Sequence, residues 1–176
     1  FCGDRKFGRT VHALIKALCG DGGFRLRLIA PEELRLPDYM RQEMRSASKL
    51  EFREGRTMEV VMPELDILYM TRVQKERFLD EEEFNRVKDS FVLDPGKLRT
   101  ARPDMIVLHP LPRVNEITRE VDNDPRAAYF RQVENGKFVR LALIYPLLRW
   151  ADEHRPFALN PVFGAEYVVN GTNSSN

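Results

Sequence analysis

The stretch Phe1–Leu18, with the sequence FCGDRKFGRTVHALIKAL, is the one from which the fold can be predicted first. Its glycine-rich turn, Gly3–Gly8, stands directly before a segment with apolar residues at the i, i+3, i+4 and i+7 positions of one helix face. Only Phe1 and Cys2 precede the turn as material for a strand. The pattern therefore predicts a strand–turn–helix unit, with the helix over Thr10–Leu18.

Further strands and helices alternate along the chain after this unit. Two segments alternate apolar and charged residues, and two are short apolar runs typical of strands buried on both faces. In chain order these four strands are Phe24–Ala30, Lys49–Glu54, Leu65–Met70 and Met105–His109. We expect helices after Thr57, where Met58, Val61 and Met62 share a face, and over Glu81–Lys88 behind a capping Asp80.

Two helices are predicted near the end of the chain. Asp124-Pro125 has the composition of a helix start, and Asn135-Gly136 that of a helix stop after Glu134. Phe138–Ala151 reads as a second, mostly apolar helix, interrupted or bent at Pro146.

Alternating strands and helices predict an α/β fold with a doubly wound, mostly parallel sheet and helices on both of its faces. Ligands of such sheets lie beyond the carboxyl ends of the strands. The loops expected there are GDRKFGRT, TRVQKERF and HPLPR.

The composition excludes several classes of protein. The 176 residues are 43% hydrophobic and 31% charged, which fits one ordinary globular core. A formal net charge of +1 gives no reason to expect a nucleic acid partner. There is no apolar run of the ~20 residues that a membrane-spanning helix needs, and no secretory signal. Two cysteines, without partners at metal-binding spacing, predict reduced thiols in a cytoplasmic protein without a metal.

The loop Gly3–Thr10 is one residue away from the nucleotide-binding pattern G-x-x-x-x-G-K-[ST], with Arg9 in place of the lysine. An arginine fork does not replace a point charge between phosphates, and no apolar strand ends in a metal-binding aspartate. Arginine suits a carboxylate better, because its fork donates two parallel hydrogen bonds. Arg9, Arg72 with Gln74, and Arg113 lie on the three expected ligand loops and could hold a dicarboxylic substrate. Surface ion pairs are the alternative role for these arginines.

Four motifs resemble the second half of the catalytic chain of the aspartate carbamoyltransferase family. They are G-D-x-K-x-G-R-T-V-H, T-R-V-Q-K-E-R-F, H-P-L-P-R-V-x-E-I and Y-F-R-Q-x-x-N-G, in the family's order. The resemblance implies transfer of the carbamoyl group from carbamoyl phosphate to L-aspartate in de novo pyrimidine synthesis, without a metal or organic cofactor. It also implies an aspartate-binding domain over residues 1–152, followed by an irregular tail over 153–176.

The resemblance assigns roles to individual residues. Arg9 is expected to contact the α-carboxylate of aspartate, and Arg72 and Gln74 its β-carboxylate. Leu111 and Pro112 are expected to face carbamoyl phosphate through backbone carbonyls.

Other residues receive a looser role or none. The resemblance places Lys75, Glu76 and Arg77 in a loop that moves on substrate binding. We expect Thr10 to cap the helix that follows it, and His12 and His109 to be structural. No residue of this chain is expected to be catalytic.

The carbamoyl phosphate domain, with its Ser-Thr-Arg-Thr loop, is absent from the sequence. The resemblance therefore predicts a chain that is inactive alone, with the missing domain as partner, a homotrimer when complete, and regulatory subunits in some cases. Two alternatives stay open. One is an ornithine carbamoyltransferase-type domain, although that family has H-C-L-P where this chain has H-P-L-P. The other is a non-catalytic binding or regulatory module.

Overall fold

The computed structural model describes residues 1–21, 23–47 and 50–153. It divides into two compact units, residues 1–137 and residues 138–176. Beyond residue 153 the predicted irregular tail lies outside the described residues.

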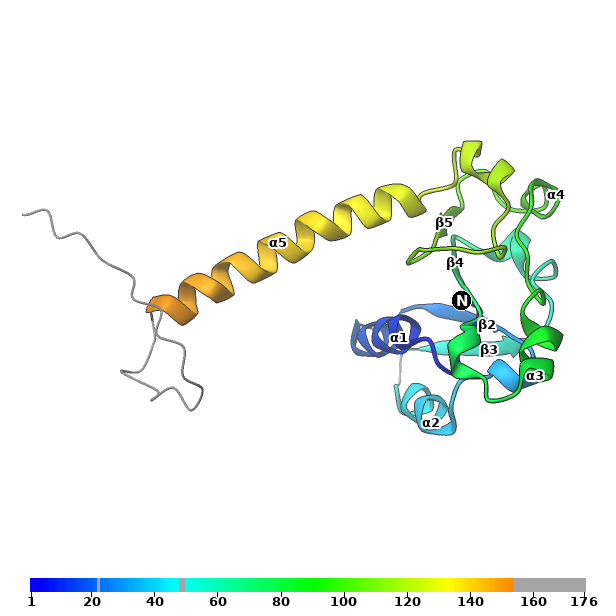
Figure 1. Ribbon diagram of the computed structural model, residues 1–176, viewed down its shortest axis with the longest axis horizontal. Coiled ribbons are helices and arrows are strands. Elements are labelled where there is room, and N and C mark those ends of the chain that lie inside the picture. Colours follow the sequence, from blue (N-terminus) through cyan, green and yellow to red (C-terminus); the bar gives the residue numbers. More distant parts are fainter. Residues whose placement is uncertain (22, 48–49, 154–176) are drawn as a thin grey trace, which may run out of the picture. The chain divides into compact units, whose positions relative to one another are not determined.

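The first unit is built on a five-stranded parallel sheet (Figure 1). Its strand order is β3-β2-β1-β4-β5, so β1 lies between β2 and β4. All four strand pairings are parallel, as the alternation of elements predicted. The strands are β1 (Cys2–Gly3), β2 (Arg25–Ile29), β3 (Glu51–Gly55), β4 (Ile67–Thr71) and β5 (Ile106–Leu108).

The described residues form five α-helices and four short 3-10 helices besides the strands. The predicted cap of α3 is confirmed, because Asp80 Oδ1 accepts a hydrogen bond from the Glu82 N–H at 2.8 Å. The α-helices are α1 (Arg9–Asp21), α2 (Asp38–Ser46), α3 (Glu81–Val87), α4 (Pro95–Leu98) and α5 (Tyr129–Glu153). The 3-10 helices are η1 (Glu32–Leu34), η2 (Met62–Glu64), η3 (Lys75–Arg77) and η4 (Arg119–Asn123).

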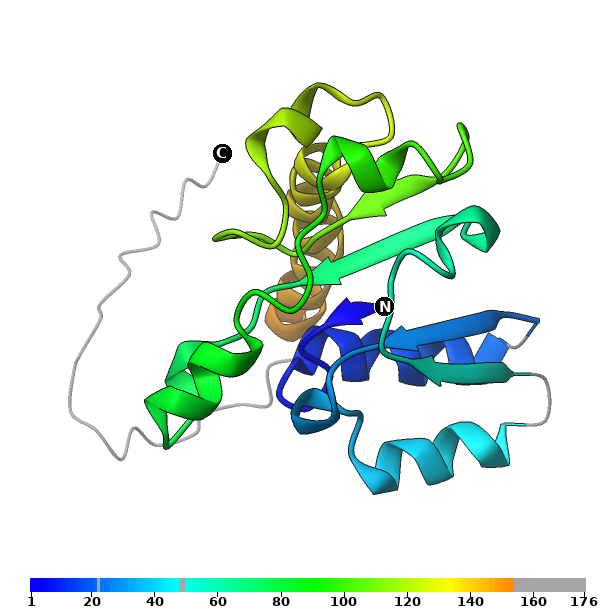
Figure 2. The same ribbon diagram turned by 90° about the vertical axis from the view of Figure 1, so that its right-hand side faces the viewer.

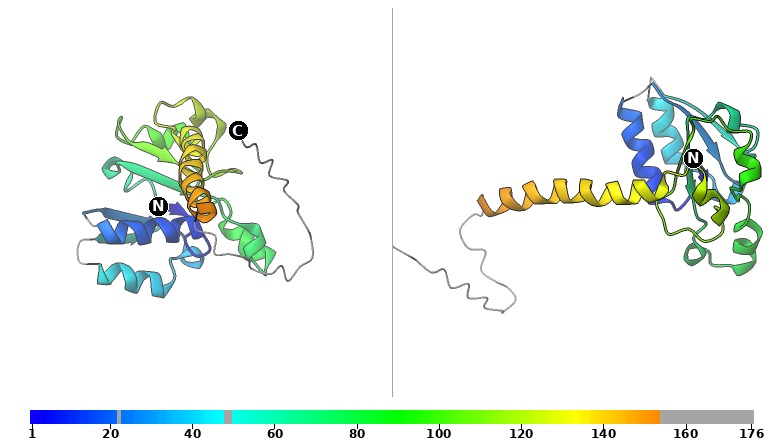
Figure 3. Two further views of the ribbon diagram at one scale, coloured as in Figure 1. Left: turned by 90° about the vertical axis from the view of Figure 1, so that its left-hand side faces the viewer. Right: turned by 90° about the horizontal axis from the view of Figure 1, so that it is seen from above.

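The two faces of the sheet belong to two separate hydrophobic cores. Consecutive strand residues point to opposite faces, so Leu28 packs in one core and Ile29 in the other. The core around Leu28 contains residues of α1 and α2, which lie on the same side of the sheet (Figure 3). The core around Ile29 contains residues of η2, α4 and η4. Helices therefore cover both faces, as predicted.

The helix expected after Thr57 is shorter than predicted. Met58 and Met62 are both buried in the core, which agrees with the predicted apolar face. Only the 3-10 helix η2 forms, however, with Pro63 at its start. Proline has no N–H to donate and its ring crowds the carbonyl of residue i−4, which disfavours an α-helix at this position.

The predicted helix start at Asp124-Pro125 is wrong. The chain after Pro125 instead forms a parallel bridge with β5, because Val107 N–H donates to the Arg126 carbonyl at 2.8 Å and Ala128 N–H donates to the Val107 carbonyl at 3.0 Å. These strand-type bonds hold the backbone in an extended form. The helix therefore begins only at Tyr129.

The predicted stop at Asn135-Gly136 is also wrong. At Pro146 the helix is not interrupted, and the alternative of a bend stays a prediction. Helix α5 continues through both to Glu153, and its residues from 138 onward belong to the second unit. A glycine inside a helix costs only about 1 kcal/mol, which the following helix-forming residues offset.

Candidate functional site

Three loops meet at one edge of the sheet, beyond the carboxyl ends of β1, β4 and β5. Parallel pairing aligns Gly3 with Thr71 and Tyr69 with Leu108. The arrowheads of β4 and β5 point to the same side in Figure 2. Between β1 and β4 the strand order changes direction, which is the position where doubly wound sheets bind ligands. The predicted ligand loops after β1 and β4 therefore lie at the switch point, and the loop after β5 lies at the same edge beside β4.

Gly3 brings the first two loops close together. Its φ of +111° is a conformation that side-chain-bearing residues rarely adopt, and a Cβ there would lie 2.2 Å from the Thr71 carbonyl oxygen. The Thr71 hydroxyl lies 3.3 Å from each of the carbonyl oxygens of Cys2 and Asp4. Only glycine allows this close approach of β1 to the end of β4.

Asp4 and Phe7 fix the loop that follows β1. The Asp4 carboxylate is fully buried and accepts a hydrogen bond from the Phe7 N–H at 2.9 Å. Burial raises the pKa of Asp4, and nearby backbone N–H groups, including that of Gln74, oppose this rise. The Phe7 ring contacts that of Phe78 at 6.0 Å. The loop after β1 is thus packed against the loop after β4.

The first turn of α1 follows this loop. The His12 N–H donates to the Gly8 carbonyl at 3.1 Å, so Gly8 is the N-cap. The expectation that Thr10 caps the helix is wrong, because Thr10 is already its second residue. The His12 Nε2 lies 2.8 Å from the Arg5 carbonyl oxygen, which supports a structural role for this ring.

The predicted aspartate-binding groups follow β1 and β4. Arg9 is exposed at the start of α1, and its guanidinium takes part in no hydrogen bond or ion pair within residues 1–21, 23–47 and 50–153. Arg72 is half-buried and donates to Glu76 at 2.8 Å. Gln74 Oε1 accepts a hydrogen bond from Arg77 Nε at 3.3 Å. The guanidinium of Arg72, predicted to bind the β-carboxylate of aspartate, thus binds the carboxylate of Glu76 in this structure.

The segment that was predicted to move, Lys75–Arg77, forms the exposed 3-10 helix η3. Lys75 pairs with Glu81 at 2.6 Å, and its ammonium lies 5.8 Å from the centre of the Phe84 ring. Exposed ion pairs contribute little to stability, so they would yield easily to a ligand. Motion of this segment stays a prediction.

The loop after β5 has an unusual backbone at Leu111. Its φ is +50°, which is uncommon for a residue with a branched side chain, and its peptide bond to Pro112 is cis. The Leu111 N–H donates to Nδ1 of His109 at 2.8 Å. This bond means that Nδ1 carries no proton. The ring is therefore in the tautomer with its proton on Nε2.

His109 and Glu116 form the buried support of this loop. His109 Nε2 donates to Glu116 Oε1 at 2.8 Å, and Glu116 Oε2 accepts from the N–H groups of Val114 and Asn115 at 3.0 and 3.1 Å. Burial would raise the pKa of Glu116, but these hydrogen bonds outweigh it and lower the pKa below its ordinary value. The ionised carboxylate thus holds both ends of the Leu111 loop, and His109 is structural in this sense.

Arg113 is not available as a substrate fork. Both of its terminal nitrogens donate to the Asp122 carboxylate, and Nη1 also lies 3.1 Å from the Tyr129 hydroxyl. Burial and the Asp122 charge raise the pKa of Tyr129 to about 12. Of the arginines that the sequence suggested for substrate binding, Arg113 is therefore held within the fold, whereas Arg72 is paired only with the exposed Glu76 and Arg9 is exposed.

Other chemistry finds little support in the part of the chain that the structure describes. Burial raises the pKa of the Cys2 thiol to about 12, so it is not a nucleophile at neutral pH. No cluster of three or more His, Cys, Asp or Glu side chains there could hold a metal ion. The described helices include none that is long and apolar enough to span a membrane.

Comparison with known proteins gives one family. A family model described as "Aspartate/ornithine carbamoyltransferase, Asp/Orn binding domain" matches residues 1–147. The aspartate carbamoyltransferase catalytic subunit of Lachnoclostridium phytofermentans is 59% identical over 148 residues, 84% of this chain and 48% of that protein. The corresponding subunit of Clostridium acetobutylicum is 55% identical over 147 residues, again 84% of this chain and 48% of the relative.

Solved structures agree with this result. The catalytic subunit of M. jannaschii aspartate transcarbamoylase matches with a TM-score of 0.77 and 38% identity over 85% of this chain and 49% of that chain. The Trypanosoma cruzi enzyme in complex with carbamoyl aspartate and phosphate has a TM-score of 0.70 and 38% identity, over 82% of this chain and 45% of that one.

The chain belongs to the Asp/Orn-binding domain family of aspartate and ornithine carbamoyltransferases. It spans about half the length of the relatives it matches.

Proposed function

We propose that this chain is the L-aspartate-binding half of an aspartate carbamoyltransferase. The observation that carries the proposal is the placement of Arg9 and of Arg72 with Gln74 at the ends of the neighbouring strands β1 and β4. Two guanidinium groups and one amide can hold the two carboxylates of aspartate, Arg9 the α-carboxylate and the other pair the β-carboxylate. The names of the most similar relatives favour aspartate over ornithine.

The partner substrate would be carbamoyl phosphate, bound mostly by the half of the enzyme that lies outside the part matched here. The backbone carbonyls of Leu111 and Pro112 would accept hydrogen bonds from the amide of carbamoyl phosphate. His109 and Glu116 would hold the loop that carries these carbonyls in place. The aspartate amine would attack the carbamoyl carbon, and phosphate would leave from the tetrahedral intermediate. Catalysis of this kind comes from positioning two anions and stabilising charge, without a cofactor.

Activity would then need the complete enzyme. We propose a cytoplasmic homotrimer of complete chains, in a pathway of pyrimidine synthesis, with regulatory subunits as further partners. The purified chain alone should make no detectable carbamoyl aspartate, because the groups that bind phosphate belong to the other domain. Turnover by this chain, free of contaminating enzyme, would contradict the proposal.

The test of the site uses a complete chain, with the carbamoyl phosphate domain of the L. phytofermentans relative joined to this one. Arg72→Ala should impair the use of aspartate far more than the binding of carbamoyl phosphate. Loss of one charge-assisted partner of a desolvated carboxylate costs about 2–5 kcal/mol, or some tens to thousands of fold. Arg72→Lys should restore part of the activity, since it keeps the charge and loses the fork.

Steady-state kinetics for both substrates would measure these effects. Arg86→Ala is the matched control, because Arg86 is an exposed arginine on α3. An unchanged response to aspartate in Arg72→Ala would refute the β-carboxylate assignment and reopen the ornithine and non-catalytic alternatives.

A further inference from the structure

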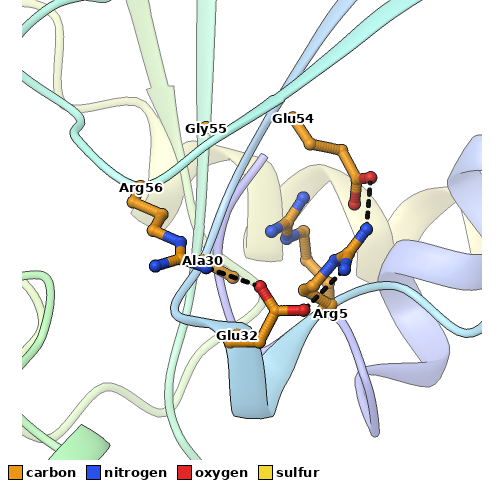
Figure 4. Close-up of a pocket in the computed structure, with 7 residues that line it drawn as sticks. Arg5, Ala30, Glu32, Glu54, Gly55 and Arg56 are labelled. Atoms are coloured by element: carbon orange, nitrogen blue, oxygen red, sulfur yellow. Dashed lines mark hydrogen bonds and ion pairs between the residues drawn. The ribbon is translucent and has the colours of Figure 1, made fainter.

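A second charged pocket lies on the same edge of the sheet, beyond the carboxyl ends of β2 and β3 (Figure 4). Its volume is about 250 Å³. The loop after β1, the start of η1 and the end of β3 each contribute to it, because Cys2 aligns with Ile29 and Ile29 with Gly55. Its charged lining residues are Arg5, Glu32, Arg35, Glu54 and Arg56.

Both carboxylates of the pocket already have guanidinium partners. Glu32 accepts hydrogen bonds from Arg35 at 2.5 Å and from Arg56 at 2.8 Å. Glu54 accepts one from Arg35 at 3.1 Å and lies 3.6 Å from a terminal nitrogen of Arg41. Figure 4 shows the first three of these contacts as dashed lines. The acceptors of the pocket are thus occupied by Arg35, Arg56 and Arg41.

Arg5 is the exception. The residue is only 1% exposed, and among the described residues no group accepts a hydrogen bond from its Nε or Nη1 atoms. Burial lowers the pKa of Arg5 to about 10, with Glu54 opposing the shift. The group therefore stays protonated at neutral pH. A buried cation with donors that lack acceptors is costly for the fold.

The backbone keeps Arg5 in this position. Its N–H donates to the Leu34 carbonyl at 3.3 Å, and its own carbonyl oxygen lies 2.8 Å from His12 Nε2. Because the main chain is held on both sides, the Arg5 side chain stays at the pocket that it lines. An anion that enters the pocket would supply acceptors to Nε and Nη1 of Arg5.

We propose that this pocket binds a small oxyanion of the phosphate type, recognised by Arg5 together with Arg35 and Arg56. Three guanidinium groups against two carboxylates leave the lining with one excess positive charge. The volume is below the ~300–1,000 Å³ of pockets for larger organic ligands, which favours a free oxyanion or a single phosphoryl group. The proposal is independent of the aspartate site.

The experiment titrates this full chain with inorganic phosphate by calorimetry at about pH 8, where phosphate is a dianion. Arg5→Met replaces the unpartnered cation with an apolar side chain of similar length. Arg86→Met is the matched control at an exposed position of α3. Arg72→Met tests whether the observed phosphate binds at the candidate aspartate site instead. A nucleoside monophosphate is titrated in parallel.

We expect Arg5→Met to weaken phosphate binding at least about tenfold, the factor for losing one charge-assisted partner. The two other variants should bind as the wild type does. Without phosphate, Arg5→Met should unfold at a higher temperature, since a buried charge without acceptors is removed. Equal binding of the monophosphate would assign the phosphoryl group as the ligand, and binding of phosphate alone would assign the free oxyanion.

The proposal is overturned if neither ligand binds the wild type. It is equally overturned if Arg5→Met binds phosphate as tightly as the wild type, or if Arg72→Met alone loses the binding. An Arg5→Met protein that is less stable than the wild type in phosphate-free buffer would show that Arg5 serves the fold and not a ligand.

Discussion

The buried carboxylate of Glu116 offers the sharpest test of how the Leu111 loop is held. Glu116 is 4% exposed and accepts three hydrogen bonds, from the His109 ring and from two backbone N–H groups. Glu116→Gln keeps the size of the side chain but replaces one acceptor oxygen with an NH₂ group. Either orientation of the amide leaves at least one of the three donors facing another donor.

The expected loss follows from these bonds. A buried donor that loses its acceptor costs about 1–3 kcal/mol. The remaining bonds also lose the charge assistance that makes carboxylate bonds roughly twice as strong as neutral ones. We therefore expect Glu116→Gln to lower the free energy of unfolding by about 2–3 kcal/mol, a large part of the ~5–15 kcal/mol typical of a domain.

Urea unfolding of the chain, followed by circular dichroism, would measure this loss. Glu134→Gln is the matched control, because Glu134 is exposed on α5 and should change the free energy by no more than about 0.5 kcal/mol. If the two variants unfold alike, the network around Glu116 does not stabilise the loop, and our account of how Leu111 is positioned fails.

The carboxylate of Glu116 also makes the free energy of unfolding depend on pH. The pKa of Glu116 is lowered from its ordinary 4.5 in the folded chain. Its contribution to stability is therefore complete above that value and is lost as the pH falls through the folded-state pKa. Between about pH 5 and pH 3 the wild type should lose stability more steeply than Glu116→Gln.

Two further predictions concern stability. Arg113→Ala breaks a partly buried ion pair in which two guanidinium nitrogens bind Asp122, and it should lower the free energy of unfolding by about 2–3 kcal/mol. The control Arg119→Ala, at an exposed position, should change the free energy of unfolding little. Equal effects of the two variants in thermal or urea unfolding would contradict the structural role of Arg113. Gly3→Ala places a Cβ 2.2 Å from the Thr71 carbonyl oxygen and should cost more than about 3 kcal/mol or prevent folding. Gly20→Ala, in open space inside α1, should instead add about 0.5–1 kcal/mol, and a stable Gly3→Ala would refute the close approach of β1 and β4.

The sequence predicted the sheet well because each strand carries its own local pattern. Apolar runs such as Ile67–Thr71 and the alternation in Arg25–Ile29 are properties of a few neighbouring residues. The position of the loops with Arg9 and Arg72 at strand ends followed from the same patterns. Helix α2 was not predicted, although Met40 and Met44 at i, i+4 spacing signal its buried face.

Some of the wrong predictions depend on partners that are distant in sequence, whereas the Thr10 cap and the helix after Thr57 were misjudged from local neighbours. Asp124-Pro125 has the composition of a helix start, but the backbone of the following residues forms strand-type hydrogen bonds with β5 instead. For Arg113 the sequence left two roles open, and the structural ion pair, made with Asp122, is the one observed. The pocket around Arg5 could not be predicted from any sequence pattern, because its charged residues come from three separate segments of the chain.

One short loop contributes to both proposed sites, and the strand order explains how. β1 lies between β2 and β4, so the segment that leaves its carboxyl end borders both directions of the sheet. Arg5 lines the pocket beyond β2 and β3, whereas Arg9 is the first residue of α1 and lies beyond the strand pair β1 and β4. The bond between the Arg5 carbonyl and the His12 ring joins the two sides. Because each arginine serves one site, Arg5→Met and Arg9→Ala should separate oxyanion binding from aspartate use. Loss of both functions in either single variant would show that the loop forms one site and not two.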